Sequence, residues 1–328
     1  MTRLAVFVTP GRSLDEAIER VIVAERLGYE SAFDNHIAAR DGLMLLAAYG
    51  QATTRIKLGT GVLPCFPRHP VSLAIEAATL DELIGGRLIL GIGPSHQITM
   101  ENWYGIPMDK PFTQMKEYVE ILRQIFTKGG AQLSGEFYKT SYAFMGYGAR
   151  ADLPIMVSAL APNMLRWAGE KTEGTVLWSC LPSYIRSTVT PLINEGVKTG
   201  GRAPGEVEII AAVPTALTTN VEAAHELFRK GFMTYMMLPF YRRAIGEAGY
   251  EAEIEAFDKA MAAGDQPGAL AAMSERMLTE FTAIGDAGAI RDKIAEYRDA
   301  GVTLPALGVV PAHDGFAGFE ATLEAAMG

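Results

Sequence analysis

The chain has 328 residues, of which 49% are hydrophobic and 20% are charged, a composition typical of a globular protein with a large core. The formal net charge of −9 argues against binding to nucleic acid, which needs a basic face, and against binding to an anionic membrane surface. No apolar run has the length of a membrane span, and the two cysteines, Cys65 and Cys180, do not make a disulfide framework. We therefore expect a cytoplasmic protein whose partner is a small molecule.

Short apolar runs alternate with amphipathic stretches, a pattern typical of βα units around a parallel sheet. In chain order, the predicted strands cover residues 4–9, 31–34, 56–62, 88–93, 154–158, 175–178, 207–212 and 304–310. The first predicted helix begins near Ser13 and ends at Gly28, and another begins at Pro70, where a missing N–H costs no hydrogen bond. Eight such units predict a (β/α)8 TIM barrel. A doubly wound sheet is the alternative, but no Gly-x-Gly-x-x-Gly pattern follows the first strand.

Three segments do not fit the repeated unit and are expected as insertions in a single domain. Residues 94–115 are predicted to form a long loop, and a helix is predicted from Gln114 onward. Residues 129–150 are rich in glycine and tyrosine and are expected to be extended, whereas 233–283 are rich in methionine and alanine and are expected to be helical. Excursions of this kind vary freely on a rigid scaffold, so we expect them to shape a substrate pocket.

A series of motifs in a fixed order resembles the luciferase-like monooxygenase family. The motifs are AERLGYES (24–31), DNH (34–36), KLGTGV (57–62), RHP (68–70), AATLDEL (77–83) and GRLILGIG (86–93). The match covers most of residues 15–125 and resumes over 157–174 and 284–302. Within the family, the motifs resemble the F420-dependent oxidoreductases more than the FMN-dependent monooxygenases. The resemblance implies a TIM barrel, coenzyme F420 as the cofactor, and a homodimer.

The resemblance also implies where the cofactor binds. In this family a bulge in the third strand holds a non-proline cis peptide against the cofactor ring, which places it at Gly61-Val62; an ordinary strand end is the alternative. The turn from Ser158 to Met164 precedes a helix, and the family uses it for the cofactor phosphate, since N–H groups at a helix N-terminus bind anions. A plain turn with Asn163 as the helix cap is the alternative. The predicted cofactor-binding residues are Asp34, Gly61, Val62, Gly93, Ser158, Ala159, Pro162, Asn163 and Met164.

Two residues are predicted to be catalytic, His36 and Glu101. His36 follows the second strand, at the family position that borders the reacting ring carbon, and an imidazole can exchange a proton near neutral pH. Glu101 is similar in placement to a carboxylate of some F420 enzymes, and His96 on the same segment is a comparable candidate. Each of these residues has a purely structural or solvated alternative. The predicted substrate-pocket residues are Phe7, Trp103 and Trp178, and no spacing of histidines and carboxylates predicts a metal site.

The predicted function is hydride transfer between F420 and an unidentified small organic substrate. The first alternative is an FMN-dependent monooxygenase that uses reduced flavin, and the second is a cofactor-binding protein without turnover. F420 carries an acidic tail, which nearby cations such as Arg40, Lys57 or Arg68 would have to receive in this acidic chain.

Overall fold

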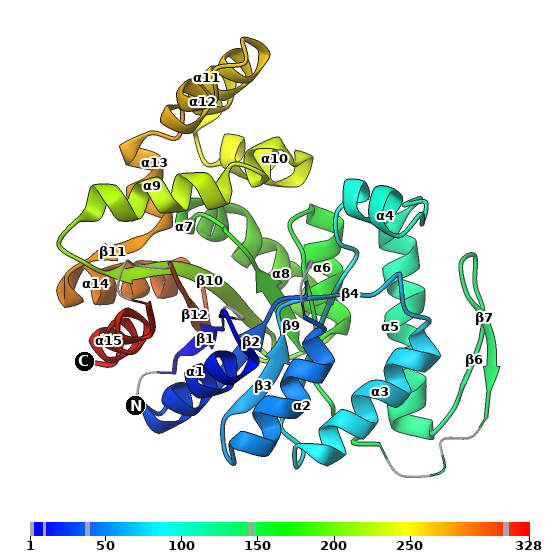
Figure 1. Cartoon of the computed structure of the whole chain (residues 1–328). Helices are drawn as coiled ribbons and strands as arrows, with labels where there is room; N and C mark the ends of the chain where they lie inside the picture. Colours follow the sequence, from blue (N-terminus) through cyan, green and yellow to red (C-terminus); the bar gives the residue numbers. More distant parts are fainter. Residues whose placement is uncertain (1–2, 9–10, 37–39, 144–145, 147–148, 311–314) are drawn as a thin grey trace.

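The computed structural model describes residues 3–8, 11–36, 40–143, 146, 149–310 and 315–328, which form a closed barrel of parallel strands inside a ring of helices (Figure 1). The barrel strands are β1 (Ala5–Phe7), β2 (Ser31–Asp34), β3 (Lys57–Thr60), β5 (Leu88–Gly93), β8 (Ile155–Val157), β9 (Gly174–Leu177), β10 (Glu208–Leu217) and β12 (Leu304–Val309). Each pairs with the next in this order, and β12 pairs with both β10 and β1, which closes the ring. The predicted TIM barrel is confirmed.

The barrel strands are buried on both faces, which explains why their sequences are continuous apolar runs rather than alternating ones. Side chains that point inward fill the barrel with a small separate core. Its members are Ala5, Phe7, Phe33, Ile89, Met156, Val176, Ile210, Ala212, Leu304 and Ala306. Side chains that point outward join the surrounding helices in a second, larger core.

Helices follow most of the barrel strands and cover the outside of the barrel. They are α1 (Leu14–Arg26), α2 (Gly42–Ala52), α3 (Pro70–Leu83), α5 (Pro111–Lys128), α6 (Pro162–Lys171), α8 (Thr190–Thr199), α14 (Ala287–Asp299) and α15 (Gly315–Met327). The predicted helix starts at Ser13 and Pro70 are confirmed, because Ser13 caps α1 through the backbone N–H of Glu16 and Pro70 is the first residue of α3. A short α7 (Pro182–Tyr184) and a π-helix, η1 (Ile185–Val189), lead into α8.

Two neighbouring helices, α6 and α8, approach each other closely enough to require glycine. A Cβ atom added to Gly196 of α8 would lie 1.9 Å from the carbonyl oxygen of Arg166, and one added to Gly169 of α6 would lie 2.2 Å from that of Ile193. The two backbones therefore pack directly against each other.

The first two insertions contain more regular structure than predicted. Residues 94–115 are not one long loop, since they contain α4 (Gln97–Trp103) and the start of α5. That helix begins at Pro111 rather than Gln114, because proline is accommodated at a helix start. The segment 129–150 contains an antiparallel hairpin of β6 (Ala131–Ser134) and β7 (Lys139–Tyr142), which confirms its extended character.

The third insertion is helical, as predicted, and stands above the barrel in Figure 1. It follows α9 (Val221–Phe232) and consists of η2 (Tyr235–Met237), α10 (Pro239–Glu247), α11 (Glu251–Ala262), α12 (Gln266–Ala271) and α13 (Glu275–Phe281). The preceding strand β10 extends to Leu217, five residues beyond the predicted end at Ala212, past a proline at 214 that interrupts the strand pattern. A short strand, β11 (Ala283–Gly285), pairs with this extension, and β4 (Leu63–Pro64) similarly pairs with β5. Among the described residues, no helix has the length and hydropathy of a membrane span.

Candidate active site

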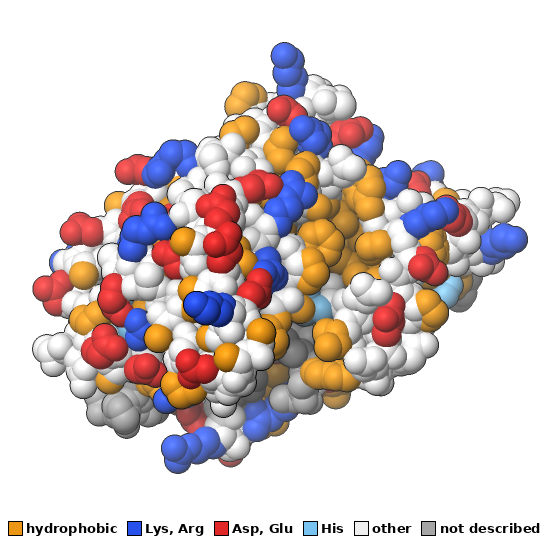
Figure 2. Space-filling model, turned by 90° about the horizontal axis from the view of Figure 1, so that it is seen from above, with side chains coloured by type: hydrophobic (Ala, Val, Ile, Leu, Met, Phe, Trp, Pro, Cys, Tyr) orange, Lys and Arg blue, Asp and Glu red, His pale blue; other side chains and the backbone are white. Residues whose placement is uncertain are grey.

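Two adjacent cavities lie at the carboxyl ends of the barrel strands, where barrel enzymes place their active sites. The larger, of about 300 Å³, is lined by residues that include Gly61, Val62, His96, Ser158 and Trp178. The smaller, of about 200 Å³, lies between Trp178, Phe7 and α9. Seen from above in Figure 2, this end of the molecule is hollowed, and hydrophobic side chains line the hollow.

One wall of the larger cavity is a bulge in the third strand. Gly59 pairs with Ile89, but Leu63 pairs with Ile92, so the third strand holds one extra residue between these two pairs. The peptide bond between Gly61 and Val62 is cis, as the resemblance implies. The sequence prediction of a bulge with a cis peptide at this position is therefore confirmed.

Two glycines allow the chain to pass close to its neighbours around this wall. A Cβ atom on Gly61 would lie 2.4 Å from Cε1 of Phe7, the ring that fills the barrel below. A Cβ atom on Gly93, at the end of β5, would lie 2.2 Å from Oγ of Ser158 and 2.9 Å from Cγ2 of Val62. Gly93 is not among the lining residues, but it lets Val62 and Ser158 come together at the cavity wall.

The turn between β8 and α6 forms the part of the wall next to the bulge. Ser158, Ala159, Asn163 and Met164 line the cavity, whereas Pro162 occupies the first position of α6. The helix cap is Ala161, which has no side-chain acceptor for the backbone N–H groups of the first turn. The alternative in which Asn163 caps the helix is therefore wrong, because that residue lies inside the helix. The N-terminus of α6 is free to donate to an anion in the cavity.

His36 lines neither of the two cavities, although its neighbour Asn35 lines the smaller one, and its ring is oriented by α2. Its Nδ1 accepts a hydrogen bond of 3.0 Å from the backbone N–H of Gly42, so the proton of the neutral ring is on Nε2. Burial lowers the pKa of His36, although the carboxylate of Asp41, whose Oδ2 is 3.6 Å from Nδ1, opposes this. The neutral imidazole is therefore the main form at neutral pH. Arg68 makes an ion pair with the same Asp41.

Asp34 is fully buried at the end of β2, where its carboxyl group faces the hydroxyl of Tyr49. Burial raises the pKa of Asp34 to about 7, even though the positive charge of Arg40 opposes the shift. Its carbonyl oxygen accepts a 2.7 Å hydrogen bond from the N–H of Gly61. Asp34 therefore lies directly behind the bulge, as a carboxyl group that gains or loses a proton near neutral pH.

The structure separates the three candidates on α4 and the segment before it. His96 lines the larger cavity, its ring packs near those of Tyr235 and Tyr241, and burial lowers its pKa. Glu101 and Trp103 are exposed on α4, and neither lines a cavity. Glu101 instead accepts a hydrogen bond from Gln97. The structure thus brings His96, which precedes α4, to the site, and leaves Glu101 and Trp103 exposed.

Phe7 and Trp178, both predicted pocket residues, do border the cavities. Their rings meet edge to face with centroids 5.3 Å apart, and Trp178 lines both cavities. The sequence analysis missed the aromatic residues Phe228 and Phe232 of α9 and Tyr235 beyond it, which line the smaller cavity. Their near-helical spacing was a signal, but that spacing is equally typical of a helix packed on a core.

Within the described part of the chain, the charged side chains stay outside both cavities. No Asp, Glu, Lys or Arg is among the described residues that line them. Lys57, named as a cation for an acidic cofactor tail, begins β3 at the opposite end of the barrel and pairs with Glu30, so that suggestion is wrong. Arg68 lies at the correct end but is already paired with Asp41 and Glu76.

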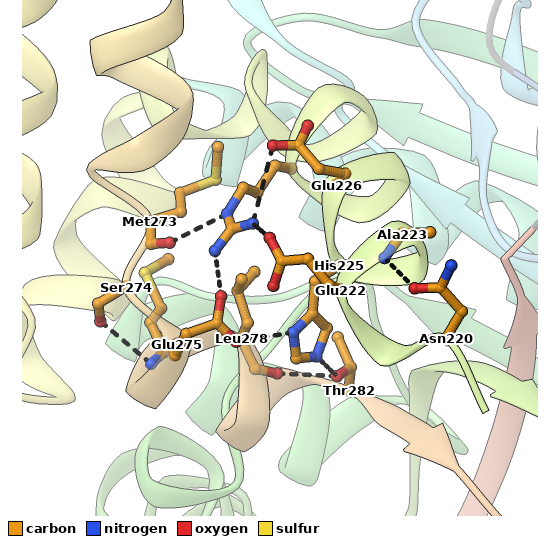
Figure 3. A network of polar contacts seen from close by, with 12 residues as sticks. Asn220, Glu222, Ala223, His225, Glu226, Met273, Ser274, Glu275, Leu278 and Thr282 are labelled. Atoms are coloured by element: carbon orange, nitrogen blue, oxygen red, sulfur yellow. Dashed lines mark hydrogen bonds and ion pairs between the residues drawn. The ribbon is translucent and has the colours of Figure 1, made fainter. Parts of the chain in front are cut away.

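A second polar cluster joins α9 to α13, away from the cavities (Figure 3). Ligand atoms of Glu222, His225 and Glu275 lie within 4.8 Å of one another, a grouping that sequence spacing did not predict. The buried Arg229 pairs with both carboxylates, and His225 also contacts Glu275, with 3.0 Å between Nδ1 and Oε2. The guanidinium of Arg229 already supplies the positive charge that a metal ion would provide. We therefore interpret the cluster as an ion-pair network that holds α9 against α13, and not as a metal site.

Comparisons with known proteins agree with this architecture. The chain is 29% identical over 308 residues to a 5,10-methylenetetrahydromethanopterin reductase of Methanopyrus kandleri, covering 87% of this chain and 86% of that protein. It is 31% identical over 224 residues to an F420-dependent glucose-6-phosphate dehydrogenase of Nakamurella multipartita, covering 64% and 66% of the two chains. The solved structure of a coenzyme F420-dependent tetrahydromethanopterin reductase from Methanopyrus kandleri superimposes with a TM-score of 0.84 at 26% identity, covering 99% and 97% of the two chains.

The family comparison extends over nearly the whole chain. The family model for luciferase-like monooxygenase matches residues 1–304. That range includes the bulged third strand, the turn before α6 and all of the residues that line the larger cavity. The chain belongs to the luciferase-like monooxygenase family.

Proposed function

We propose that this protein is an F420-dependent oxidoreductase that transfers a hydride between F420 and a small organic substrate. The relatives named above support the choice of F420 over FMN. The observation that carries the proposal is the larger cavity itself, with the cis Gly61-Val62 bulge on one wall and the open N-terminus of α6 on another.

The residues present fit such a cofactor. An uncharged cavity of about 300 Å³ suits a flat aromatic ring system held against Gly61 and Val62. The uncapped backbone N–H groups of α6, near Ser158 and Asn163, suit its phosphate. When bound, F420 accepts or donates a hydride, so the protein has to orient the substrate and handle protons.

We assign the handling of the proton to His36, which follows the lining residue Asn35 at the end of β2. It is half-buried and neutral, and the Gly42 N–H fixes the orientation of its ring. In this tautomer the Nε2–H can donate a hydrogen bond to the oxygen of a carbonyl or an alcohol, whereas a proton taken from an alcohol would go to Nδ1 in place of the hydrogen bond from the Gly42 N–H. Because Asp34 lies behind the bulge, ionisation of its carboxyl group adds a negative charge close to this site.

The N-terminus of α6 offers a sharp test of this proposal, through the substitutions Ala161→Asp and Ala161→Asn. Both side chains cap a helix well, so neither should destabilise the fold. The aspartate also places a negative charge where the cofactor phosphate would bind, and we expect it to weaken F420 binding by about tenfold or more. Asparagine, which has the same shape without the charge, should weaken binding much less.

The measurement is a spectral titration of the wild type and both variants with F420 and with FMN. The proposal predicts a complex with F420, a loss specific to Ala161→Asp, and little binding of FMN. Tight FMN binding without F420 binding would indicate the reduced-flavin monooxygenase instead. F420 binding without hydride transfer to any carbonyl or from any alcohol would indicate a protein that binds the cofactor without turnover.

A further inference from the structure

The smaller cavity adjoins the larger one, but Gly61 and Val62 of the bulge are not among its lining residues. It lies between the ends of β1, β9, β10 and β12 and the helix α9. Trp178 lines both cavities, so the two adjoin at its ring, and the Phe7 ring packs directly on Gly61. A molecule in the smaller cavity would therefore lie next to a ring held against Gly61 and Val62.

The chemistry of this lining is aromatic and neutral. Phe228 and Phe232 stack with their centroids 5.3 Å apart, and Trp178 meets Phe7 edge to face. The polar side chains among the described lining residues are Asn35, Ser179, Trp178 and Tyr235. Burial raises the pKa of Tyr235, so its hydroxyl stays neutral over the physiological range.

A charged substrate would find no counter-ion among the described residues of this cavity. Transfer of an unpaired phosphate or carboxylate into such surroundings is strongly unfavourable, whereas a carbonyl or hydroxyl needs only one neutral hydrogen-bond partner. The size of the cavity gives a second constraint. An apolar cavity of about 150 Å³ holds a benzene molecule, and this one, at about 200 Å³, leaves room for one ring with a short substituent.

We propose that the smaller cavity is the substrate site and selects an uncharged compound with a single carbon ring that bears a ketone or a secondary alcohol. This inference rests on the proposed function for its redox step. In the reduction, a hydride from reduced F420 adds to the carbonyl carbon and a proton adds to its oxygen; oxidation of the alcohol is the reverse. The cavity excludes phosphorylated and carboxylated substrates.

The test compares cyclohexanone with cyclohexanecarboxylate, which has the same ring with a negative charge, and with glucose 6-phosphate. Binding of each probe to the whole protein is measured by saturation-transfer NMR, with and without F420. We expect cyclohexanone to bind at least about tenfold more tightly than either anion. Equal or tighter binding of an anion would overturn the inference.

Gly231 of α9 allows the binding to be located. It lines the rim of the smaller cavity, and a Cβ atom added there would meet no atom within 4 Å. Gly231→Leu should therefore close the cavity without a clash, and it replaces a poor helix former with a good one. We expect cyclohexanone binding to weaken by about tenfold or more, with F420 binding unchanged.

The matched control is Lys230→Leu, which adds the same side chain one position earlier, at an exposed residue outside the cavity. It should leave cyclohexanone binding unchanged. If Gly231→Leu bound cyclohexanone as well as the wild type, the assignment of this cavity would be wrong. Failure of F420 to bind would instead contradict the proposed function, while the probe measurements without F420 would still decide what this cavity selects.

Discussion

The carboxyl group of Asp34 is buried at the end of β2, and its pKa of about 7 makes it the most perturbed carboxyl group near the site. In the unfolded chain this group titrates at its ordinary value, so the folded state binds more protons between about pH 4 and pH 7. The free energy of unfolding therefore falls as the pH rises through this window, and the loss is complete above the folded pKa.

Asp34→Asn should remove this pH dependence, because the amide has no proton to lose. Urea denaturation at about pH 5 and pH 8 should show a fall in the free energy of unfolding that is smaller in the variant by about 1–4 kcal/mol. Other groups titrate equally in both proteins, so the difference between the two falls reports Asp34 alone. Equal falls would mean that this carboxyl is ionised throughout.

His36 gives a prediction about turnover rather than stability. His36→Ala should lower kcat by about 100-fold or more if the imidazole transfers the proton, while the affinity for F420 changes little. His36→Asn keeps a hydrogen-bond acceptor for the N–H of Gly42 and tests whether orientation of α2 matters separately. Steady-state rates near the wild-type value in both variants would exclude a proton-transfer role.

At this scale, the site residues at strand ends could be predicted from the sequence, whereas the site residues on helices were predicted less accurately. Gly61, Val62, Ser158 and Met164 lie in motifs tied to strand ends, and strand ends converge in any barrel. Glu101 and Trp103 lie on a helix, whose rotation about its axis is fixed by packing against distant residues. A different rotation of the helix about its axis would decide whether such a side chain faces the cavity or the solvent.

At the scale of elements, the contact between α6 and α8 depends on having no side chain at Gly196. Gly196→Ala would place a methyl group against the backbone of α6, and we expect it to destabilise the protein by about 1–3 kcal/mol. Gly231→Ala is the matched control, since this helical glycine has open space around it and should stabilise the protein by up to about 1 kcal/mol. Thermal and urea denaturation should show opposite signs for the two variants.

The strands and their order were predictable because eight buried apolar runs, each separated by an amphipathic helix, leave few topologies open. For the insertions, only the general character, extended or helical, could be predicted, and not the individual strands and helices. The extension of β10 beyond Ala212 and the added β11 depend on each other, since β11 pairs with the last three residues of β10. Neither segment has a strand signal strong enough to be recognised alone.

At the scale of the whole molecule, we propose that the chain forms a homodimer, on the basis of its resemblance to the family. The chain mass is 35.4 kDa, so light scattering should give about twice this value, independent of concentration over the micromolar range. A mass equal to that of one chain at all concentrations would contradict the proposal.

The substrate cavity is bounded below by the barrel and on one side by α9. Amino-acid substitutions at these two boundaries should have different consequences. Phe7 belongs both to the cavity and to the packed interior of the barrel, so a substitution there alters folding stability together with ligand preference. The cavity face of α9 belongs to a helix that Arg229 and His225 join to α13 of the third insertion. New specificities should therefore arise, in natural divergence or in directed evolution, by exchange of α9 residues while the aromatic floor is retained.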